Sequence, residues 1–332
     1  MLTVLCLNAG IDRTYDVDGF RAGVHYRPQR TQVHAGGKGI NVARIAHRLD
    51  VETIVSGFAG GAGGLFIAKN LRSEGVLTDF VDIEEEPRVC INVVNRKGKQ
   101  QTRVDEPGPL VAPSEVEKLK VKWNELLAKS TCAVLSGSAP RGVPHSIYAE
   151  LVAMGRRAGV PTMLDTRDEL LAEGVKGVPL LIKPNIDELS TLKDSPVQST
   201  QHALALAREV NKTGVSIVIV SMGGHGAVAS TRKQGAWYAT PPKVEVVSTV
   251  GCGDAMVAGF ASASLLGRDF DECFRWGCAA GAANAASFGN AACTKEQIID
   301  LIPQVKMNRV DEVSAEPAPT SDGEGATQAQ PL

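Results

Sequence analysis

Short apolar runs alternate with longer amphipathic segments along the second half of the chain. Their periods predict helices at 114–129, 144–157 and 201–212 and strands at 132–135, 162–164, 180–182 and 216–220. Parallel strands need a crossover, which is commonly a helix, and the resulting sheet is covered by helices on both faces. The alternation therefore predicts an α/β fold with a mainly parallel sheet.

Two segments before residue 114 have the alternation of exposed strands instead. Polar and apolar residues roughly alternate in segment 12–34, and segment 88–107 has the pattern of a hairpin. A period of two is typical of strands that bury only one face. We expect the two segments to form a smaller, partly exposed sheet.

The C-terminal end of the chain has a different composition. From Asp311 onward Glu, Pro, Ser, Gly, Ala and Gln dominate without a helical or strand period, and such segments bury too little apolar surface to fold. We expect one domain over 1–308 and a disordered tail over 309–332.

Charge and cysteine content exclude several classes of protein. Lys plus Arg number 35 and Asp plus Glu 37, a net charge of −2, which argues against a nucleic-acid or membrane partner. No apolar run approaches the ~18 residues of a membrane span, and the N-terminus lacks the basic region of a signal peptide, so we expect a cytoplasmic protein. The seven cysteines, without a C-x-x-C pair, predict reduced thiols and no disulfide or zinc framework.

A glycine-rich turn that leads into a helix of small residues lies at 248–260. Gly251 and Gly253 permit unusual backbone angles, and the N-terminus of the following helix would favour an anion. Asp254 would stand beside that anion, where a general base can take a proton from an acceptor hydroxyl while backbone amides hold a phosphoryl group. An N-capping Asp after a glycine turn is the structural alternative.

The segment AGGKGINVAR is a second glycine-rich turn before a helix. The backbone at Gly36 and Gly37 could approach a ligand closely. Lys38 adds a positive charge, and Asn41 lies on the first helical turn. Because Lys38 is followed by Gly39 and not by Ser or Thr, this is not a P-loop. A plain strand-to-helix turn is the alternative, but four ligand-suited residues in six positions favour a binding site.

Further polar residues follow predicted strands, where open α/β sheets bind ligands. Asp12 follows the first strand, at 4–7, and Lys183 follows the strand at 180–182. Asn185 and Glu188 would share one face of a starting helix and suit oxygen ligation of Mg²⁺ or its waters, with a helix-capping pair as the alternative.

Three other features suit a ligand or have a plain structural explanation. Ser221 and the glycines at 223, 224 and 226 could clear space for a nucleotide or form a turn. The alanine-rich helix at 273–287 could accept a purine ring or a neighbouring helix. Arg88 and Arg103 could bind an anion or be ordinary exposed arginines of a sheet.

Five of these motifs occur in the order typical of the ribokinase-type (PfkB) carbohydrate kinases. The chain resembles this family from residue 1 to about 305, and within it the branch of 1-phosphofructokinase, tagatose-6-phosphate kinase and the minor 6-phosphofructokinase. The motifs are Asp12, Gly36-Gly37-Lys38-Gly39-x-Asn41, Asn185-x-x-Glu188, Ser221-x-Gly223-x-x-Gly226 and Gly251-x-Gly253-Asp254.

The resemblance implies a three-layer α/β/α sandwich with a small β-sheet lid, through which two subunits form a homodimer. It also implies ATP- and Mg²⁺-dependent phosphorylation of a ketohexose phosphate, with fructose 1-phosphate ahead of tagatose 6-phosphate and fructose 6-phosphate. A sugar-phosphate sensor without catalysis is the alternative from another class of protein, and the intact catalytic motif argues against it. A kinase for neutral sugars is a third reading, and two cations beside the sugar argue against that one.

Family analogy also implies a role for each site residue. In the transfer step Asp254 is the base, and the anion hole is formed by Gly251, Cys252 and Gly253. Mg²⁺ is organised by Asn185 and Glu188. The nucleotide is contacted by Lys183, Asn185, Ser221, Gly223, Gly226, Gly253, Gly281 and Asn284. The sugar hydroxyls are held by Asp12, Gly36, Gly37 and Asn41, and the existing phosphate by Lys38, Arg88 and Ser136 or Ser138.

The chain departs from the family pattern at three places. Asn8 is followed by Ala9, where the family usually has Pro. Cys252 replaces the usual Ala, Gly or Ser, so the anion hole carries an oxidisable thiol. Segment 60–64, before a predicted helix at 65–74, is unusually rich in glycine.

Overall fold

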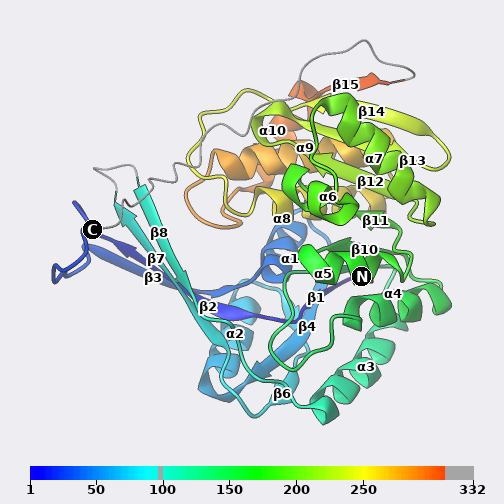
Figure 1. Ribbon diagram of the computed structural model, residues 1–332. Helices are drawn as coiled ribbons and strands as arrows, with labels where there is room; N and C mark the ends of the chain where they lie inside the picture. The colour runs from blue at the N-terminus through cyan, green and yellow to red at the C-terminus, as the bar shows by residue number, and fades with distance from the viewer. Residues whose placement is uncertain (96–99, 311–332) are drawn as a thin grey trace.

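The computed structural model describes residues 1–95 and 100–310 as a large sheet between helices, with a smaller sheet that projects from its side (Figure 1). The turn predicted between the two strands of segment 88–107 falls partly on residues 96–99, and these residues and the predicted tail from residue 311 onward lie outside the described residues. The predicted α/β fold with a mainly parallel sheet is confirmed.

The large sheet has eleven strands, ordered β15-β14-β13-β12-β11-β10-β9-β1-β4-β5, with β6 beside β4. Neighbours from β4 to β12 along this order pair in parallel, and β13 to β15 add an antiparallel edge. The bounds are β1 Leu2–Cys6, β4 Thr53–Gly60, β5 Leu77–Thr78, β6 Val81–Ile83, β9 Cys132–Ser136, β10 Thr162–Asp165, β11 Leu181–Ile182, β12 Ile217–Ser221, β13 Ala227–Thr231, β14 Gly235–Thr240 and β15 Lys306–Arg309.

Helices cover the two faces of this sheet. Along β1 and the residues after it, Leu2, Val4 and Cys6 pack into one apolar cluster, whereas Leu5 and Leu7 pack into the other. The first cluster lies under α1 Lys38–Arg48, α2 Gly61–Ser73, α8 Cys252–Leu265, α9 Phe270–Ala285 and α10 Lys295–Leu301. The second lies under α3 Pro113–Leu127, α4 Ile147–Arg157, α5 Asp168–Val175, α6 Ile186–Lys193 and α7 Thr200–Lys212. Burial on both faces explains why β1 and β9 are continuous apolar runs.

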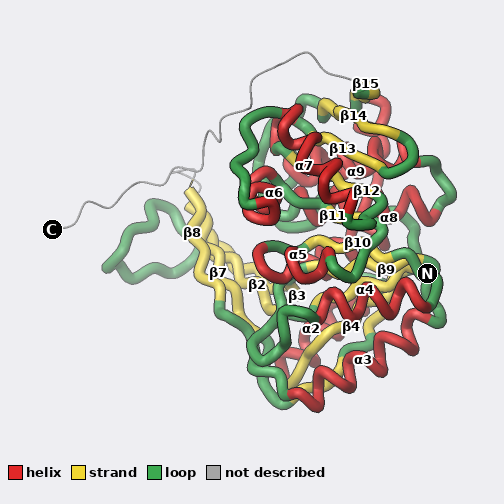
Figure 2. The backbone as a smooth tube through the Cα atoms, turned by 45° about the vertical axis from the view of Figure 1, so that its right-hand side comes forward, coloured by secondary structure: helices red, strands yellow, loops and turns green. Residues whose placement is uncertain are grey.

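The smaller sheet, which we call the lid, consists of β3-β2-β7-β8 and extends away from the body (Figure 2). Its strands are β2 Gly10–Asp16, β3 Arg30–Gly36, β7 Arg88–Asn95 and β8 Gln100–Asp105. They come from the two segments whose alternation predicts an exposed sheet. In the register of the lid, Asp12 pairs with Cys90 and Cys90 with Asp105, which places these polar residues on one face.

Three details differ from the sequence-based expectations. The helix expected from residue 65 begins at Gly61, because the Glu86 carboxylate accepts hydrogen bonds from the N–H groups of Ala62 (2.8 Å) and Gly63 (2.7 Å). The antiparallel edge β13–β15 is not expected from the pattern. Its last strand runs to Arg309, and the Val310 N–H donates to Ala236 O at 2.8 Å, so the order extends past the expected boundary at 308.

Within residues 1–95 and 100–310, none of the helices combines the length and the apolar character that a membrane crossing requires.

A buried guanidinium group anchors the lid to the body. Arg44, on α1 and 7% exposed, donates to Glu74 through Nε (2.6 Å) and Nη2 (2.8 Å). Its Nη1 donates to the carbonyl of Ala35, at the end of β3, at 2.6 Å. The Ala35 N–H in turn donates to Asn70 Oδ1 on α2 at 2.7 Å. The end of the lid strand is therefore fixed to both α1 and α2.

Replacing Arg44 by Met should lower the free energy of unfolding by about 3 kcal/mol, because the change leaves the half-buried Glu74 carboxylate and the Ala35 carbonyl without their donor. This is the lower end of the range for buried pairs, since Glu74 is 29% exposed. Urea denaturation measures the difference. The control is Arg72→Met, an exposed arginine on α2, which should change stability by less than about 0.5 kcal/mol. Equal stability of the two variants would contradict the anchoring role.

Candidate active site

A cavity of about 1120 Å³ lies between the lid, the carboxyl ends of β1, β9, β10, β11 and β12, and the start of α8. Most of the residues singled out in the sequence line it: Asp12, Gly37, Lys38, Asn41, Arg88, Ser138, Lys183, Asn185, Glu188, Ser221, Gly223, Gly226, Gly251, Cys252, Gly253, Asp254 and Gly281. Three singled-out residues do not line it: Gly36, Ser136 and Asn284.

The turn before α8 is built around a glycine in the left-handed region. Gly251 has φ 80 and is the N-cap of the helix. Asn284, expected at the nucleotide site, is instead fully buried beneath this turn, where its Nδ2 donates to the Val250 carbonyl at 2.9 Å. The first amides of a helix have no intrahelical acceptor, so the supported turn presents donors to an anion in the cavity.

The Cys252 thiol sits in this turn and is partly buried. Burial raises its pKa above the ordinary value, and the Asn284 side chain only partly opposes the effect. The thiolate is the form that reacts with oxidants, so the structure argues against the easily oxidised thiol that the sequence suggests at this position.

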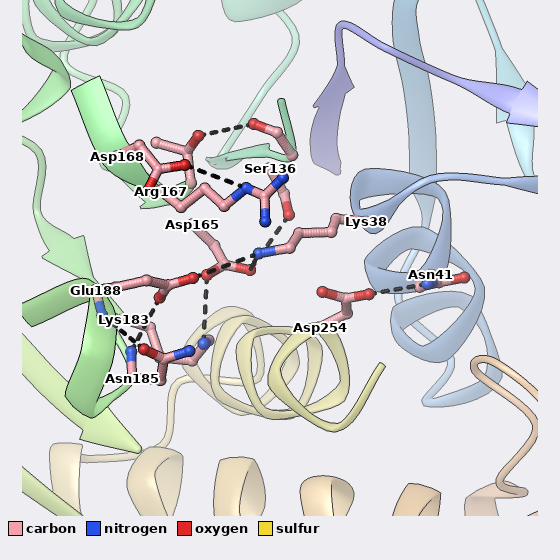
Figure 3. Close-up of polar contacts among 12 residues, drawn as sticks. Lys38, Asn41, Ser136, Asp165, Arg167, Asp168, Lys183, Asn185, Glu188 and Asp254 are labelled. Atoms are coloured by element: carbon pink, nitrogen blue, oxygen red, sulfur yellow. Dashed lines mark hydrogen bonds and ion pairs between the residues drawn. The ribbon is translucent and has the colours of Figure 1, made fainter. Parts of the chain in front are cut away.

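Asp254 lies in the first turn of α8 and is 5% exposed. Asn41 Nδ2, on α1, donates to Asp254 Oδ2 at 2.8 Å (Figure 3). Burial, followed by the negative charge of Asp165, raises the pKa of Asp254 to about 6, against the opposing effect of Lys38. A carboxylate with this pKa is ionised at neutral pH and still basic enough to accept a proton.

A second buried carboxylate, Asp165, lies at the end of β10 and is 1% exposed. Lys183 Nζ is 3.3 Å from its Oδ1, and Lys38 Nζ is 3.9 Å from its Oδ2 (Figure 3). Although burial opposes ionisation, these two lysines hold the pKa of Asp165 below its usual range. Asp165 in turn is the main cause of a raised pKa at Lys38, which stays a cation.

Sequence reasoning missed Asp165, although a usable signal exists. A carboxylate directly follows the apolar strand predicted at 162–164, just as Asp12 follows the first strand. Ser136, expected to hold a phosphate, is instead buried, with its hydroxyl 3.5 Å from Asp165 Oδ2. It supports the carboxylate from behind the cavity wall.

Asn185 and Glu188 form the capping pair that their spacing allows. Asn185 Oδ1 accepts from the Glu188 N–H at 2.7 Å, and Glu188 Oε2 accepts from the Asn185 N–H at 2.9 Å. The other carboxylate oxygen, Oε1, lies 4.0 Å from Lys38 Nζ. Asn185 is therefore committed to the helix start, while Glu188 also presents charge to the cavity.

The donor set fits Mg²⁺ only when the cation is shared with bound phosphates. In the described residues no group of three or more His, Cys, Asp or Glu side chains could hold a metal ion alone. Mg²⁺ typically takes one or two carboxylates, keeps several waters and uses substrate phosphate oxygens for the rest. Glu188 Oε1 and Asp165 are the cavity carboxylates that suit this arrangement.

The lid side of the cavity carries hydrogen-bonding groups around Asp12 and Asn8. Asn8 Nδ2 donates to Ser138 Oγ at 3.1 Å, and Arg88 Nε donates to the Asn8 carbonyl at 3.2 Å. Asn290 Nδ2 donates to Asp12 Oδ2 at 3.3 Å. These contacts place a guanidinium, a hydroxyl and a carboxylate along one wall.

Two unpaired acceptors mark this wall as a place for hydroxyl groups. The Oδ1 atoms of Asn8 and Asn41 are buried and, among the described residues, have no hydrogen-bond partner. Buried acceptors without a donor are costly, so a ligand hydroxyl that donates to them would be favoured. Gly36 does not line the cavity, but a Cβ there would lie 2.3 Å from the Asp12 carboxylate, so glycine leaves room for that side chain.

The opposite end of the cavity is lined by Ser221, Gly223, Gly226 and Gly281. Gly226 has φ 92, and a Cβ there would lie 2.0 Å from the Ala239 carbonyl, so close packing on β14 requires this glycine.

Segment 240–246 also lines the cavity and was missed in the sequence, because it lacks a helical or strand period. Asn8 also lines the cavity and was missed although it directly follows the strand predicted at 4–7, whereas Arg167, Thr249 and Asn290 were missed without a local signal.

Comparison with known proteins shows that most of the chain is similar in sequence to carbohydrate kinases. The model of the pfkB family carbohydrate kinases matches residues 2–297. The chain is 32% identical over 315 residues to tagatose-6-phosphate kinase of Staphylococcus epidermidis, covering 93% of this chain and 100% of that protein. It is 31% identical over 310 residues to 1-phosphofructokinase of Bacillus subtilis, with the same coverage.

Solved structures agree with these relatives. A possible 1-phosphofructokinase of Thermotoga maritima superposes with a TM-score of 0.86 at 28% identity, covering 93% of this chain and 99% of that one. Phosphofructokinase-2 of Escherichia coli in complex with fructose-6-phosphate superposes with a TM-score of 0.83 at 25% identity, covering 92% and 98%.

Proposed function

The chain belongs to the pfkB family of carbohydrate kinases, and from this premise we propose that it transfers the γ-phosphoryl group of ATP to a ketohexose phosphate, preferably fructose 1-phosphate. It is an enzyme that transfers phosphate to a hydroxyl group, a hexose-phosphate kinase by its relatives. The acceptor within that class, the nucleotide and the metal are parts of the proposal.

The observation that carries the proposal is the buried Asp254, oriented by Asn41 at the start of α8. The oxygen of the acceptor hydroxyl forms a bond to the γ-phosphorus, and Asp254 takes the proton of that hydroxyl. The bond between the γ-phosphorus and the bridging oxygen of ADP breaks. The amides of the first turn of α8 hold the equatorial oxygens of the transferring group. Lys38 and Lys183 offset its negative charge.

Replacing Asp254 by Asn should lower kcat by about 10²–10⁴, the usual contribution of a positioned general base. The variant should fold normally, because Asn is isosteric and can still pair with Asn41. Coupled detection of ADP release measures the turnover, and urea denaturation checks the fold. A folded variant that retains more than about a tenth of the wild-type kcat would remove Asp254 from the mechanism.

We propose Mg²⁺ as the accompanying cation. When bound, it neutralises charge on the phosphates of the nucleotide, and Glu188 is the carboxylate best placed to hold it or its waters. Two negatively charged groups, the ATP phosphates and Glu188, would otherwise repel each other. Turnover should therefore disappear in excess EDTA and return with added Mg²⁺, and Glu188→Gln should raise the Mg²⁺ concentration needed for half-maximal rate. Equal turnover with and without EDTA would exclude a metal requirement.

Local charge supports a phosphorylated acceptor. With a net charge of −2, the protein offers no long-range attraction for a sugar phosphate, so nearby donors must recruit it. Arg88 and Arg103 line the lid side of the cavity with Asp12, and Asn8 links Arg88 to Ser138 on the same wall. The preference for fructose 1-phosphate rests on likeness to the 1-phosphofructokinases, and the likeness to tagatose-6-phosphate kinase is equally close.

Replacing Arg88 by Gln should lower kcat/KM for the sugar phosphate about ten- to a hundredfold, because a charge-assisted hydrogen bond contributes about 1.5–3 kcal/mol. Activity on free fructose should change little. Arg30→Gln, an exposed arginine at the start of β3 in the lid, is the matched control. Steady-state kinetics with all three sugar phosphates rank the acceptors. A clear preference for a 6-phosphate would overturn the ranking, and a preference for free fructose would overturn the anionic acceptor.

We also propose that two copies associate through the outer face of the lid. Val104 is 61% exposed and Val33 37% exposed, and both alternate with the residues that face the cavity. Exposed apolar side chains on a sheet favour burial against a second copy. Sedimentation velocity should show a dimer for the wild type and a monomer for Val104→Asp. A monomeric wild type at micromolar concentration would contradict this assembly.

A further inference from the structure

One cavity cation has no part in the function proposed above. Arg167 lies two residues after the end of β10, is the N-cap residue of α5 and lines the cavity. Its side chain extends toward Lys38 on the side of Asp165 (Figure 3). Asp165 is the main cause of the raised pKa of Lys38, and the positive charge of Arg167 is close enough to lower that pKa. Two neighbouring cations repel each other unless an anion lies between them.

Arg167 is more weakly engaged than Lys183 and Lys38, the cations on either side of Asp165. Lys183 is almost fully buried against Asp165, at 3.3 Å, and Lys38 faces both Asp165 and Glu188. In the described part of the chain, the ion pair of Arg167 is with its neighbour Asp168, from Nε at 3.4 Å, and the two side chains are 66% and 70% exposed. Exposed ion pairs of this kind contribute little to stability. Because this pair uses Nε, the terminal nitrogens of Arg167 remain for a ligand.

The backbone beside Arg167 is in an unusual conformation. Asp168 has φ 53, in the left-handed region that residues other than glycine seldom adopt. Arg167 before it is extended, with φ −136 and ψ 172. Such conformations cost about 1–3 kcal/mol and concentrate at functional sites. Here the left-handed residue comes directly after Arg167, at the start of α5.

We propose that Arg167 is a phosphoryl-binding residue that, together with Lys38, binds a phosphoryl dianion at the carboxyl end of β10. A guanidinium presents two parallel N–H donors that match two phosphoryl oxygens, which a lysine cannot do. The proposal rests on the proposed kinase function, which offers two sources for the dianion. These are the phosphate already on the acceptor and the γ-phosphoryl group in transfer.

Kinetics of Arg167→Gln test the role and identify the source. The variant should lose about ten- to a hundredfold in kcat/KM for the preferred sugar phosphate, the expected effect of a charge-assisted pair. A higher KM for the sugar phosphate, with unchanged activity on free fructose, assigns the acceptor phosphate. An equal fall in kcat for phosphorylated and free sugar assigns the γ-phosphoryl group. Arg167→Lys keeps the charge and should recover part of the loss.

The matched control is Arg156→Gln, an exposed arginine in the last turn of α4, which should leave kcat and KM unchanged. If kcat and KM of Arg167→Gln stay within twofold of the wild type for both sugars, the inference is wrong while the kinase function stands. If the wild-type protein phosphorylates no hexose phosphate, the proposed function itself fails, and the two results cannot be confused.

Discussion

The site depends on one buried hydrogen bond between residues far apart in the sequence. Asn41 on α1 donates to Asp254 on α8 at 2.8 Å, and α1 and α8 pack within the same apolar cluster. In a poorly solvated site this bond holds the carboxylate at one position, and burial keeps its pKa near neutrality. The glycine turn at 251, the lid strand before α1 and the buried Asn284 all serve to bring these two helix starts together.

Charge in the cavity is arranged around Asp165. This carboxylate lies within ion-pair distance of both Lys38 and Lys183, and it is the main cause of the raised pKa of Lys38, which stays a cation. A phosphoryl group that enters the cavity therefore meets preformed positive charge, and no side chain needs to reorganise as the reaction proceeds. Asp165 also raises the pKa of Asp254, so one buried residue affects both the cations and the base.

Sequence reasoning predicted the parts of the fold and site that have a local signal. The parallel strands are recognisable in the sequence as continuous apolar runs, because they are buried on both faces. The two glycine turns are recognisable because few other residues fit them. The hairpin β13–β14 and the strand β15 lack such a pattern. Asp165 directly follows an apolar strand, a signal that was overlooked, whereas Arg167 and Asn290 join the cavity only through tertiary packing. Ser136 and Asn284 were misplaced because a motif position does not distinguish a cavity wall from the buried support behind it.

The central claim, that Asp254 accepts the acceptor's proton, is tested most directly by the ratio of wild-type to Asp254→Asn kcat/KM as a function of pH, because kcat/KM reports the pKa of the free enzyme. Below its pKa Asp254 carries a proton and cannot accept another, so activity is lost as the pH falls through about 6. The ionisations of the sugar phosphate and ATP occur in both proteins and cancel in the ratio. We predict a ratio that rises about tenfold per pH unit below that value and is level above it. A ratio that stays constant between about pH 5 and 8 would contradict the assignment.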